Sequence, residues 1–234
     1  MVQLPRQPKH ELVGTKIMSF EILSRIGLLI LFVTLLVSVS NLGMAVACWI
    51  GGVRVTEIVL FSGKPVFTIK TRFCPIKIGY IPTGGYIKPD VDAFPKKNLL
   101  TRCLVNLAGP VSIFITSLIC LGFLHTAASF QSTYSQFLGI VLSPMTYGKS
   151  LIGGYLAHAQ AAPIAGYGIL AAKNAALSLL PLPAISGGRL LIELTKKRDD
   201  SRLAKLITLI GTLFALAVFI SLAVAMFNYF FRNN

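Results

Sequence analysis

Acidic side chains and histidines are scarce in this chain. Its 234 residues include 8 Asp and Glu against 22 Lys and Arg, with only 3 histidines. Charged residues make up 13% of the chain, whereas a soluble globular domain carries roughly 25%. Hydrophobic residues make up 54%. The composition therefore excludes an ordinary soluble domain and indicates a membrane protein.

Paired cysteines and basic nucleic-acid motifs are also missing. The four cysteines form no Cys-x-x-Cys pair and lie in or beside apolar stretches, at Cys48, Cys74, Cys103 and Cys120. This pattern is typical of free thiols that pack as small hydrophobic side chains, so no disulfide framework is expected. The net charge of +14 is not carried by a basic helix with interleaved aromatic residues. We therefore expect no nucleic-acid partner and attribute the charge to membrane topology and anionic lipid head groups.

Four long apolar stretches predict an all-α polytopic membrane protein with four transmembrane helices. They cover residues 17–50, 104–127, 162–180 and 206–231. The first is too long for the apolar core of a signal peptide, so it is expected to be retained as a spanning helix. Residues 1–16 are polar and contain Pro5 and Pro8, which predicts a flexible tail. Residues 17–234 are expected to form one membrane domain without a PDZ module.

The segment from residue 126 to residue 161 is apolar but is interrupted by Pro144 and by glycines. We expect an outer-side loop with a short interfacial helix. A fifth span within residues 137–157 is the alternative. Near the start of the first span, Glu21 and Arg25 are four residues apart and are expected to pair on one helix face.

Basic residues are concentrated in two of the predicted loops. Residues 51–102 hold nine Lys and Arg, and residues 181–205 hold six. With four spans both loops lie on one side, and the positive-inside rule places them in the cytoplasm and both termini outside. We expect an integral protein of the bacterial inner membrane whose two basic loops contact anionic lipid head groups.

Residues 53–90 differ from an ordinary loop. They are rich in Val, Ile, Phe, Tyr and Thr, with turn residues at Ser62-Gly63-Lys64-Pro65 and Gly84-Gly85. This composition predicts a β-hairpin between the first two spans. Because its strands are apolar on more than one face, we expect the hairpin to be associated with the membrane.

Four stretches resemble the site-2 proteases, which are intramembrane zinc metalloproteases. They are "GGVRVTEIVLFSGKPVF", "IGYIPTGGYIKPD", "NLAGPVSIFITSLI" and "LLPLPAISGGRLL", in that order. The second resembles the family's Pro-x-Gly-Gly-Tyr-x-Lys turn, and the fourth its Asn-x-x-Pro-x-Pro-x-Leu-Asp-Gly-Gly motif. The resemblance implies a zinc ion held by two His of a helical HExxH and by the Asp of the last motif, with the motif's Glu as general base.

None of these zinc-site residues is found at the matching positions. Counting back from the Gly-Val stretch places Ser40 and Met44 at the two His positions and Asn41 at the Glu position. A shift of register does not help, because residues 22–56 contain no His, Asp or Glu. Ser186 stands where the family has its Asp. Ser178 replaces the family's Asn before the Pro-x-Pro segment.

The three histidines of the chain do not rebuild the site. His10 opens a His-Glu dipeptide in the polar tail, but Gly14 occupies the second His position. His125 and His158 flank the predicted outer segment, on the wrong side for a site that faces the cytoplasm. We therefore predict a degenerate family member without catalytic residues, bound zinc or another cofactor.

The Pro-x-Pro segment and the Gly-Gly-Tyr turn are retained without the ligands. Prolines enforce an extended path and glycines allow close backbone approach. The retained elements either preserve the fold only or form a groove that binds a helix or strand without cutting it. The groove is expected to consist of Gly84, Gly85, Tyr86, Ser178, Pro181, Pro183, Gly187 and Gly188.

The functional prediction is a pseudoprotease that scaffolds, regulates or chaperones another integral membrane protein, in a hetero-complex. One alternative is an active intramembrane metallopeptidase with a non-standard ligand set. Another is an integral subunit of a transport or envelope-assembly complex.

Overall fold

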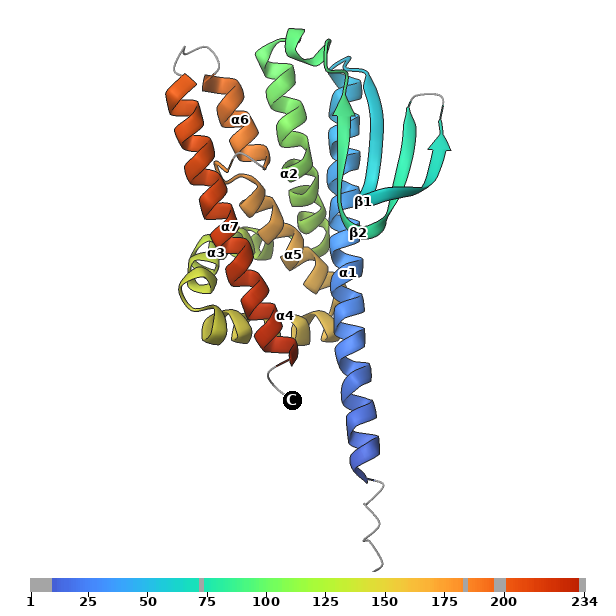
Figure 1. Ribbon diagram of the computed structural model, residues 1–234, viewed down its shortest axis with the longest axis vertical. Helices are drawn as coiled ribbons and strands as arrows, with labels where there is room; N and C mark the ends of the chain where they lie inside the picture. The colour runs from blue at the N-terminus through green and yellow to red at the C-terminus, as the bar shows by residue number, and fades with distance from the viewer. Residues whose placement is uncertain (1–9, 72–73, 183–184, 196–200, 232–234) are drawn as a thin grey trace, which may run out of the picture.

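The computed structural model describes residues 10–71, 74–182, 185–195 and 201–231. These residues form a helical bundle with a small sheet beside its first helix (Figure 1). The helices and strands are α1 (His10–Ile50), β1 (Val55–Lys70), β2 (Pro75–Pro89), the 3-10 turn η1 (Phe94–Lys96), α2 (Leu99–Leu121), α3 (Phe123–Leu142), the π-helical turn η2 (Pro144–Gly148), α4 (Lys149–Ala161), α5 (Pro163–Ser178), α6 (Ser186–Thr195) and α7 (Ser201–Phe231).

Three helices among the described residues are long and apolar enough to cross a membrane. They are Glu21–Ile50 of α1, Leu99–Leu121 of α2 and Gly211–Phe230 of α7. The predicted span at residues 162–180 corresponds to α5, which has 16 residues. At 1.5 Å per residue α5 is ~24 Å long, less than the ~30 Å thickness of a bilayer's hydrocarbon core. The predicted number of four spanning helices is therefore not confirmed.

Two predicted boundaries differ from the structure. α1 begins at His10, inside the predicted polar tail, because residues 9–50 contain no proline and the chain continues directly into the apolar helix. Residues 1–9 lie outside the described parts. The second span ends at Leu121 rather than at residue 127, because Gly122 adopts a φ of 73° and its N–H closes the last turn on the Leu118 carbonyl.

The predicted loop at residues 126–161 is helical along most of its length. It comprises most of α3, the turn η2 and α4. Pro144 lies in the first turn of η2, and Pro163 begins α5. Proline is tolerated in the first turn of a helix, where its missing N–H has no intrahelical partner. These prolines therefore separate consecutive helices and do not break the segment into a loop.

α5 lies at the centre of the bundle and contacts α2, α3 and α4. Its alanines form a fully buried stripe of Ala171, Ala172, Ala175 and Ala176. Ala171 and Ala175 pack in one cluster with Leu36 of α1 and Ile113 of α2. Small side chains allow neighbouring helices to approach closely, as is typical of helix packing in membranes.

Polar contacts also join the helices. Ser117 of α2 is buried and donates a hydrogen bond to the Gly168 carbonyl of α5 at 2.8 Å. The predicted pair of Glu21 and Arg25 is confirmed at 2.6 Å. The Arg25 guanidinium also donates to Gln160 of α4 at 3.1 Å and to Tyr229 of α7. One arginine thus connects α1 to two other helices at the end of the bundle away from the sheet.

The sheet lies between the first two predicted spans, where the hairpin is expected. β1 and β2 pair in antiparallel register, and both strands bend. Ile58 pairs with Ile87 and also with Ile76. Residues 58–60 therefore lie between two arms of β2, residues 76–78 and residues 85–87. The outer part of β1 then pairs with residues 75–79. Phe61 and Gly63 have positive φ of 68° and 95° near the bend in β1.

The segments with most of the basic residues leave the bundle at one end. The C-terminal end of α1, the start of α2, the end of α6 and the start of α7 lie at the top of Figure 1. The N-terminal end of α1, the C-terminal end of α7 and α4 lie at the bottom. We call the top the sheet end, because β1 and β2 flank the C-terminal half of α1 there.

Candidate functional site

The α1 stretch at residues 40–44 packs closely on α2. A Cβ atom added to Gly109 would lie 2.6 Å from the Ser40 hydroxyl oxygen. A Cβ atom added to Gly43 would lie 2.4 Å from the Ser112 hydroxyl oxygen. Ser112 also donates a hydrogen bond to the Val39 carbonyl of α1 at 3.1 Å. Small residues on both helices therefore bring the two backbones together.

Asn41 occupies the position that the resemblance assigns to the general base. Its side chain is buried, with 3% exposure, and lies against β2. A Cβ atom added to Gly85 would lie 2.7 Å from Asn41 Nδ2, so only glycine fits there. Asn41 Nδ2 has no hydrogen-bond partner among the described residues. A donor buried in this way costs ~1–3 kcal/mol.

A groove with a volume of about 420 Å³ opens beside Met44. We call it the sheet-end groove. Its walls come from the end of α1, from β2 and the residues after it, from α2 and from α6. The lining residues are Met44, Cys48, Tyr86, Ile87, Lys88, Pro89, Asp90, Val91, Phe94, Pro95, Val105, Asn106, Arg189, Ile192 and Glu193. Four elements that are distant in the sequence therefore meet around one opening.

The structure brings only some of the predicted site residues to this groove. Among the positions that replace the family's zinc-site residues, Met44 lines the groove. Among the predicted groove residues, Tyr86 lines it. Ser40 and Asn41 instead face α2 and β2, and Ser186 is not among the lining residues. Gly85 packs on Asn41, and Gly84 is exposed with a φ of 79°.

Several predicted groove residues lie at the junction of α5 and α6. Gly187, in the first turn of α6, is buried against the end of α5: an added Cβ would lie 2.3 Å from the Leu179 carbonyl oxygen and 2.4 Å from that of Leu180. Gly188 is also buried, whereas Pro181 is exposed. Ser178 lies 3.5 Å from Asn174 in the last turn of α5, and Pro183 lies outside the described residues. Gly187 therefore allows α6 to approach the end of α5 closely, and the later residues Arg189, Ile192 and Glu193 of α6 form part of the groove wall.

Glu193 is one of the lining residues that sequence reasoning missed. Its carboxylate accepts a hydrogen bond from the Arg102 guanidinium at 2.5 Å, and the two side chains are 13% and 18% exposed. This ion pair connects α6 to α2 at the groove wall. A signal was present, because Glu193 is the only acidic residue between Asp92 and Asp199. An isolated charge in an apolar region is expected to have a specific partner.

The residues present do not fit the zinc site that the resemblance implies. Zinc in proteins is held by thiolate, imidazole or carboxylate groups, and Ser40, Asn41 and Met44 supply none of them. Within the described ranges, no three His, Cys, Asp or Glu side chains are placed to hold a metal ion. Of the potential metal donors in the groove, Cys48 is fully buried, Glu193 is paired with Arg102, and Asp90 accepts hydrogen bonds from the backbone N–H groups of Asp92 and Ala93.

A polar network fixes the edge of the groove that β2 provides. Lys77 and Glu57 form an ion pair at 2.5 Å, and the Tyr86 hydroxyl donates to the same carboxylate at 3.1 Å. The hydrogen bond from Lys77, together with that from Tyr86, lowers the pKa of Glu57. The hydrogen bond to Glu57 raises the pKa values of Lys77 and Tyr86. The network therefore holds the Tyr86 ring in place beside the opening.

Residues 28–222 match the model of peptidase family M50. The matched range extends from α1 into α7 and includes every element around the groove. A search of curated proteins finds no match.

Proposed function

The chain belongs to peptidase family M50, the site-2 protease family, and we propose that it is a non-catalytic member that binds another integral membrane protein. The observation that carries this proposal is the donor set at the zinc positions. Ser40, Asn41 and Met44 offer a hydroxyl, an amide and a thioether where hydrolysis needs two imidazoles and a carboxylate. Ser40 and Asn41 are instead used in packing, against Gly109 and Gly85.

The sheet-end groove is the proposed binding surface. Residues 85–89 of β2 pair with β1, and within the described residues no second strand pairs with their other edge. Residues 86–89 also line the groove. An extended segment of a partner can therefore add to this edge by backbone hydrogen bonds, with its side chains in the groove. The partner we propose is an integral membrane protein with such a segment near the membrane surface, held in a hetero-complex.

The groove lining suits binding of a segment without its hydrolysis. Ile87, Val105 and Ile192 provide apolar walls, and Asn106 adds an uncharged polar group. Arg189 and Lys88 are exposed at the same opening and can receive acidic side chains of the partner. The only acidic groups of the lining are Asp90 and Glu193. Glu193 is already held by Arg102, and Asp90 accepts hydrogen bonds from the backbone N–H groups of Asp92 and Ala93.

The orientation we propose places the sheet end in the cytoplasm and both termini outside, in a bacterial inner membrane. The support is the concentration of Lys and Arg in residues 51–102 and 181–205. These basic segments would also contact anionic lipid head groups. Labelling single cysteines introduced at Lys64 and at Ser150 with a membrane-impermeant reagent tests this orientation. Only Ser150→Cys should react from outside in intact cells.

Site-specific crosslinking tests the proposed function. A photoreactive residue at Lys88, in the groove, is compared with one at Lys64, on the outer part of β1; both positions are exposed. We expect a crosslinked membrane protein from position 88 only. Filling the groove by Asn106→Trp should abolish that product. The control Ile119→Trp adds the same bulk on α2, at a side chain with 80% exposure, and should leave it unchanged.

Two results would contradict the proposal. Equal crosslinking from positions 64 and 88, or a product that survives Asn106→Trp, would mean that the groove is not the binding surface. One tightly bound zinc per purified chain, together with peptidase activity that is lost on Asn41→Ala, would instead indicate a metallopeptidase with a non-standard ligand set.

A further inference from the structure

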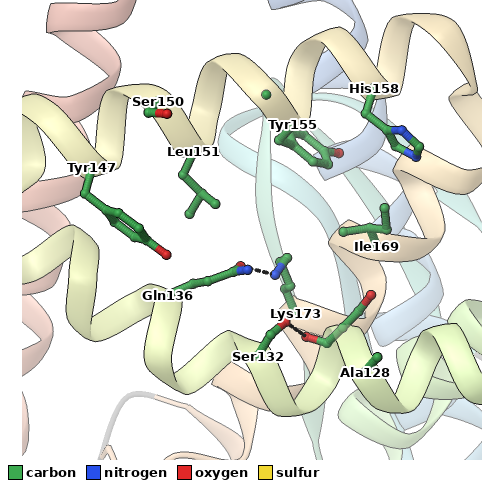
Figure 2. A pocket seen from close by; sticks show the side chains of 12 residues that line it. Ala128, Ser132, Gln136, Tyr147, Ser150, Leu151, Tyr155, His158, Ile169 and Lys173 are labelled. Carbon is green, nitrogen blue, oxygen red and sulfur yellow. Dashed lines mark hydrogen bonds between the residues drawn. The ribbon is translucent and has the colours of Figure 1, made fainter.

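A second cavity, of about 590 Å³, lies between α3, α4 and α5. Figure 2 shows Gln136 and Ser132 from α3, Tyr147 of η2 with Tyr155 and His158 of α4, and Lys173 from α5 around it. None of its lining residues is shared with the sheet-end groove. We call it the α3–α5 cavity. Ligand binding in the α3–α5 cavity is therefore independent of the function proposed for the sheet-end groove.

Lys173 is the charged group of this cavity. Its side chain is half-buried, and its ammonium donates a hydrogen bond to Oε1 of the Gln136 side-chain amide inside the cavity (Figure 2). Gln136 is neutral, so this bond does not balance the positive charge. An ammonium group in an apolar bundle is costly unless a counter-charge accompanies it.

None of the acidic side chains that the structure describes accompanies Lys173. Glu21 pairs with Arg25, Glu57 with Lys77, and Glu193 with Arg102. Asp90 and Asp92 lie before α2 at the sheet end. The lining of the α3–α5 cavity contains no Asp or Glu. Within the described chain, the cavity therefore has one cation and no anion.

The remaining lining provides hydrogen-bonding groups and apolar walls. The hydroxyl groups come from Ser129, Ser132, Tyr147, Ser150 and Tyr155. Tyr155 already donates to the Gly166 carbonyl at 3.2 Å, and Ser132 donates to the Ser129 carbonyl at 3.1 Å, so the oxygens of these two hydroxyls are left as acceptors. Leu151 and Ile169 form the apolar part in the same view (Figure 2).

We propose that the α3–α5 cavity binds an anionic phosphate or carboxylate group, with Lys173 as the counter-cation. The bound group replaces the missing acidic partner of Lys173 by a charge-assisted hydrogen bond. The hydroxyls of Ser129, Tyr147 and Ser150 can donate to its other oxygens, and Leu151 and Ile169 contact an apolar attachment. The source is either the head group of an anionic lipid or a free small anion, and the experiment separates the two.

The test uses the full-length chain, delipidated in a neutral detergent. One arm adds phosphatidylglycerol or the zwitterionic phosphatidylcholine and counts retained lipids by native mass spectrometry. The other arm titrates inorganic phosphate against chloride at constant ionic strength and follows the unfolding temperature. Lys173→Gln removes the cation. Lys64→Gln is the matched control, because it removes the same charge from an exposed position of β1.

Gln136→Glu provides a second variant that keeps Lys173 and its contact. It places a carboxylate beside the ammonium, so the chain supplies its own anion and the ligand is excluded. This variant decides the test if Lys173→Gln fails to fold. Lys173→Arg keeps the charge and should retain binding.

We expect one of the two probes, phosphatidylglycerol or inorganic phosphate, to bind with the same affinity to wild type, Lys64→Gln and Lys173→Arg. Lys173→Gln and Gln136→Glu should bind it at least about tenfold more weakly, which corresponds to ~1.4 kcal/mol. Binding of phosphatidylglycerol alone assigns a lipid head group, and binding of phosphate assigns a free anion. The proposal is overturned if wild type binds phosphatidylglycerol no better than phosphatidylcholine and phosphate no better than chloride. It is also overturned if Lys173→Gln and Gln136→Glu both bind like wild type.

Discussion

Replacing Gly187 by alanine is expected to loosen the contact between α6 and the end of α5. The added Cβ would lie 2.3 Å from the Leu179 carbonyl oxygen and 2.4 Å from the Leu180 carbonyl oxygen. Both are backbone atoms, so no side-chain rotation relieves the overlap. Contacts under 3.0 Å are essentially never made by Cβ atoms, and α6 must therefore move away from α5.

The size of the effect follows from two opposing contributions. Forcing extra atoms into a closely packed position costs ~1–3 kcal/mol. Alanine is a better helix former than glycine by ~1 kcal/mol in a helix interior, but Gly187 lies in the first turn of α6, where less of that gain is realised. We therefore expect a net loss of ~1–2 kcal/mol in the free energy of unfolding.

The assay is thermal unfolding of the purified chain in one detergent, with Gly27→Ala as the control. An added Cβ at Gly27, also in a helix, would meet no atom within 4 Å, so this variant should unfold at the wild-type temperature or slightly above it. Gly187→Ala should unfold several degrees lower. Because α6 carries Arg189 and Glu193, it should also weaken crosslinking from the groove. If the two alanine variants unfold alike, the close contact at Gly187 does not contribute to stability, and the reasoning is refuted.

Further outcomes are expected at other sites. Arg102→Met or Glu193→Leu alone should lower the free energy of unfolding by ~2–4 kcal/mol, because each removes one member of a largely buried ion pair, and the double variant should recover much of it in a double-mutant cycle. Asn41→Leu should leave the unfolding free energy unchanged or raise it by up to ~1–3 kcal/mol, because it removes a buried donor without a described partner; a clear loss would reveal a hidden partner. The sheet should respond to pH through Glu57 and Lys77. Since the pKa of Glu57 is lowered, its stabilising contribution is present above its ordinary value of 4.5 and is lost as the pH falls through the lowered value. Since the pKa of Lys77 is raised, its contribution is present below its ordinary value of 10.5 and is lost as the pH rises through the raised value. Hydrogen exchange of β1 and β2 amides should show less protection at the acid limit, and Glu57→Gln should remove that dependence.

The apolar character of α1 illustrates what the sequence leaves open. The helix is apolar on nearly all sides, so its pattern predicts a span but not which face packs inward. The inward face at residues 40–44 is set by Gly109 and Ser112 of α2 and by Gly85 of β2. These contacts depend on how two other elements pack, so the burial of Asn41 could not be predicted from α1 alone.

The hairpin and the segment after α2 show the same limit. Turn residues and β-branched side chains predicted strands between residues 53 and 90, but not the bend that places residues 58–60 between the two arms of β2. That bend includes Phe61 with a positive φ, which is not a preference of phenylalanine. Similarly, Pro144 suggested a loop, although proline is compatible with the first turn of a new helix.

The amino-acid sequence alone indicates an apolar, basic chain with long helices, a hairpin after the first of them, and motifs that resemble the site-2 proteases. These features depend on composition and on local spacing, which each segment carries without its neighbours. The packing of the elements is what places Met44, Tyr86 and Glu193 around one groove and makes Lys173 face a separate cavity without an acidic partner among the described residues. These environments arise where helices distant in the sequence pack together, because burial and charge balance are properties of that packing.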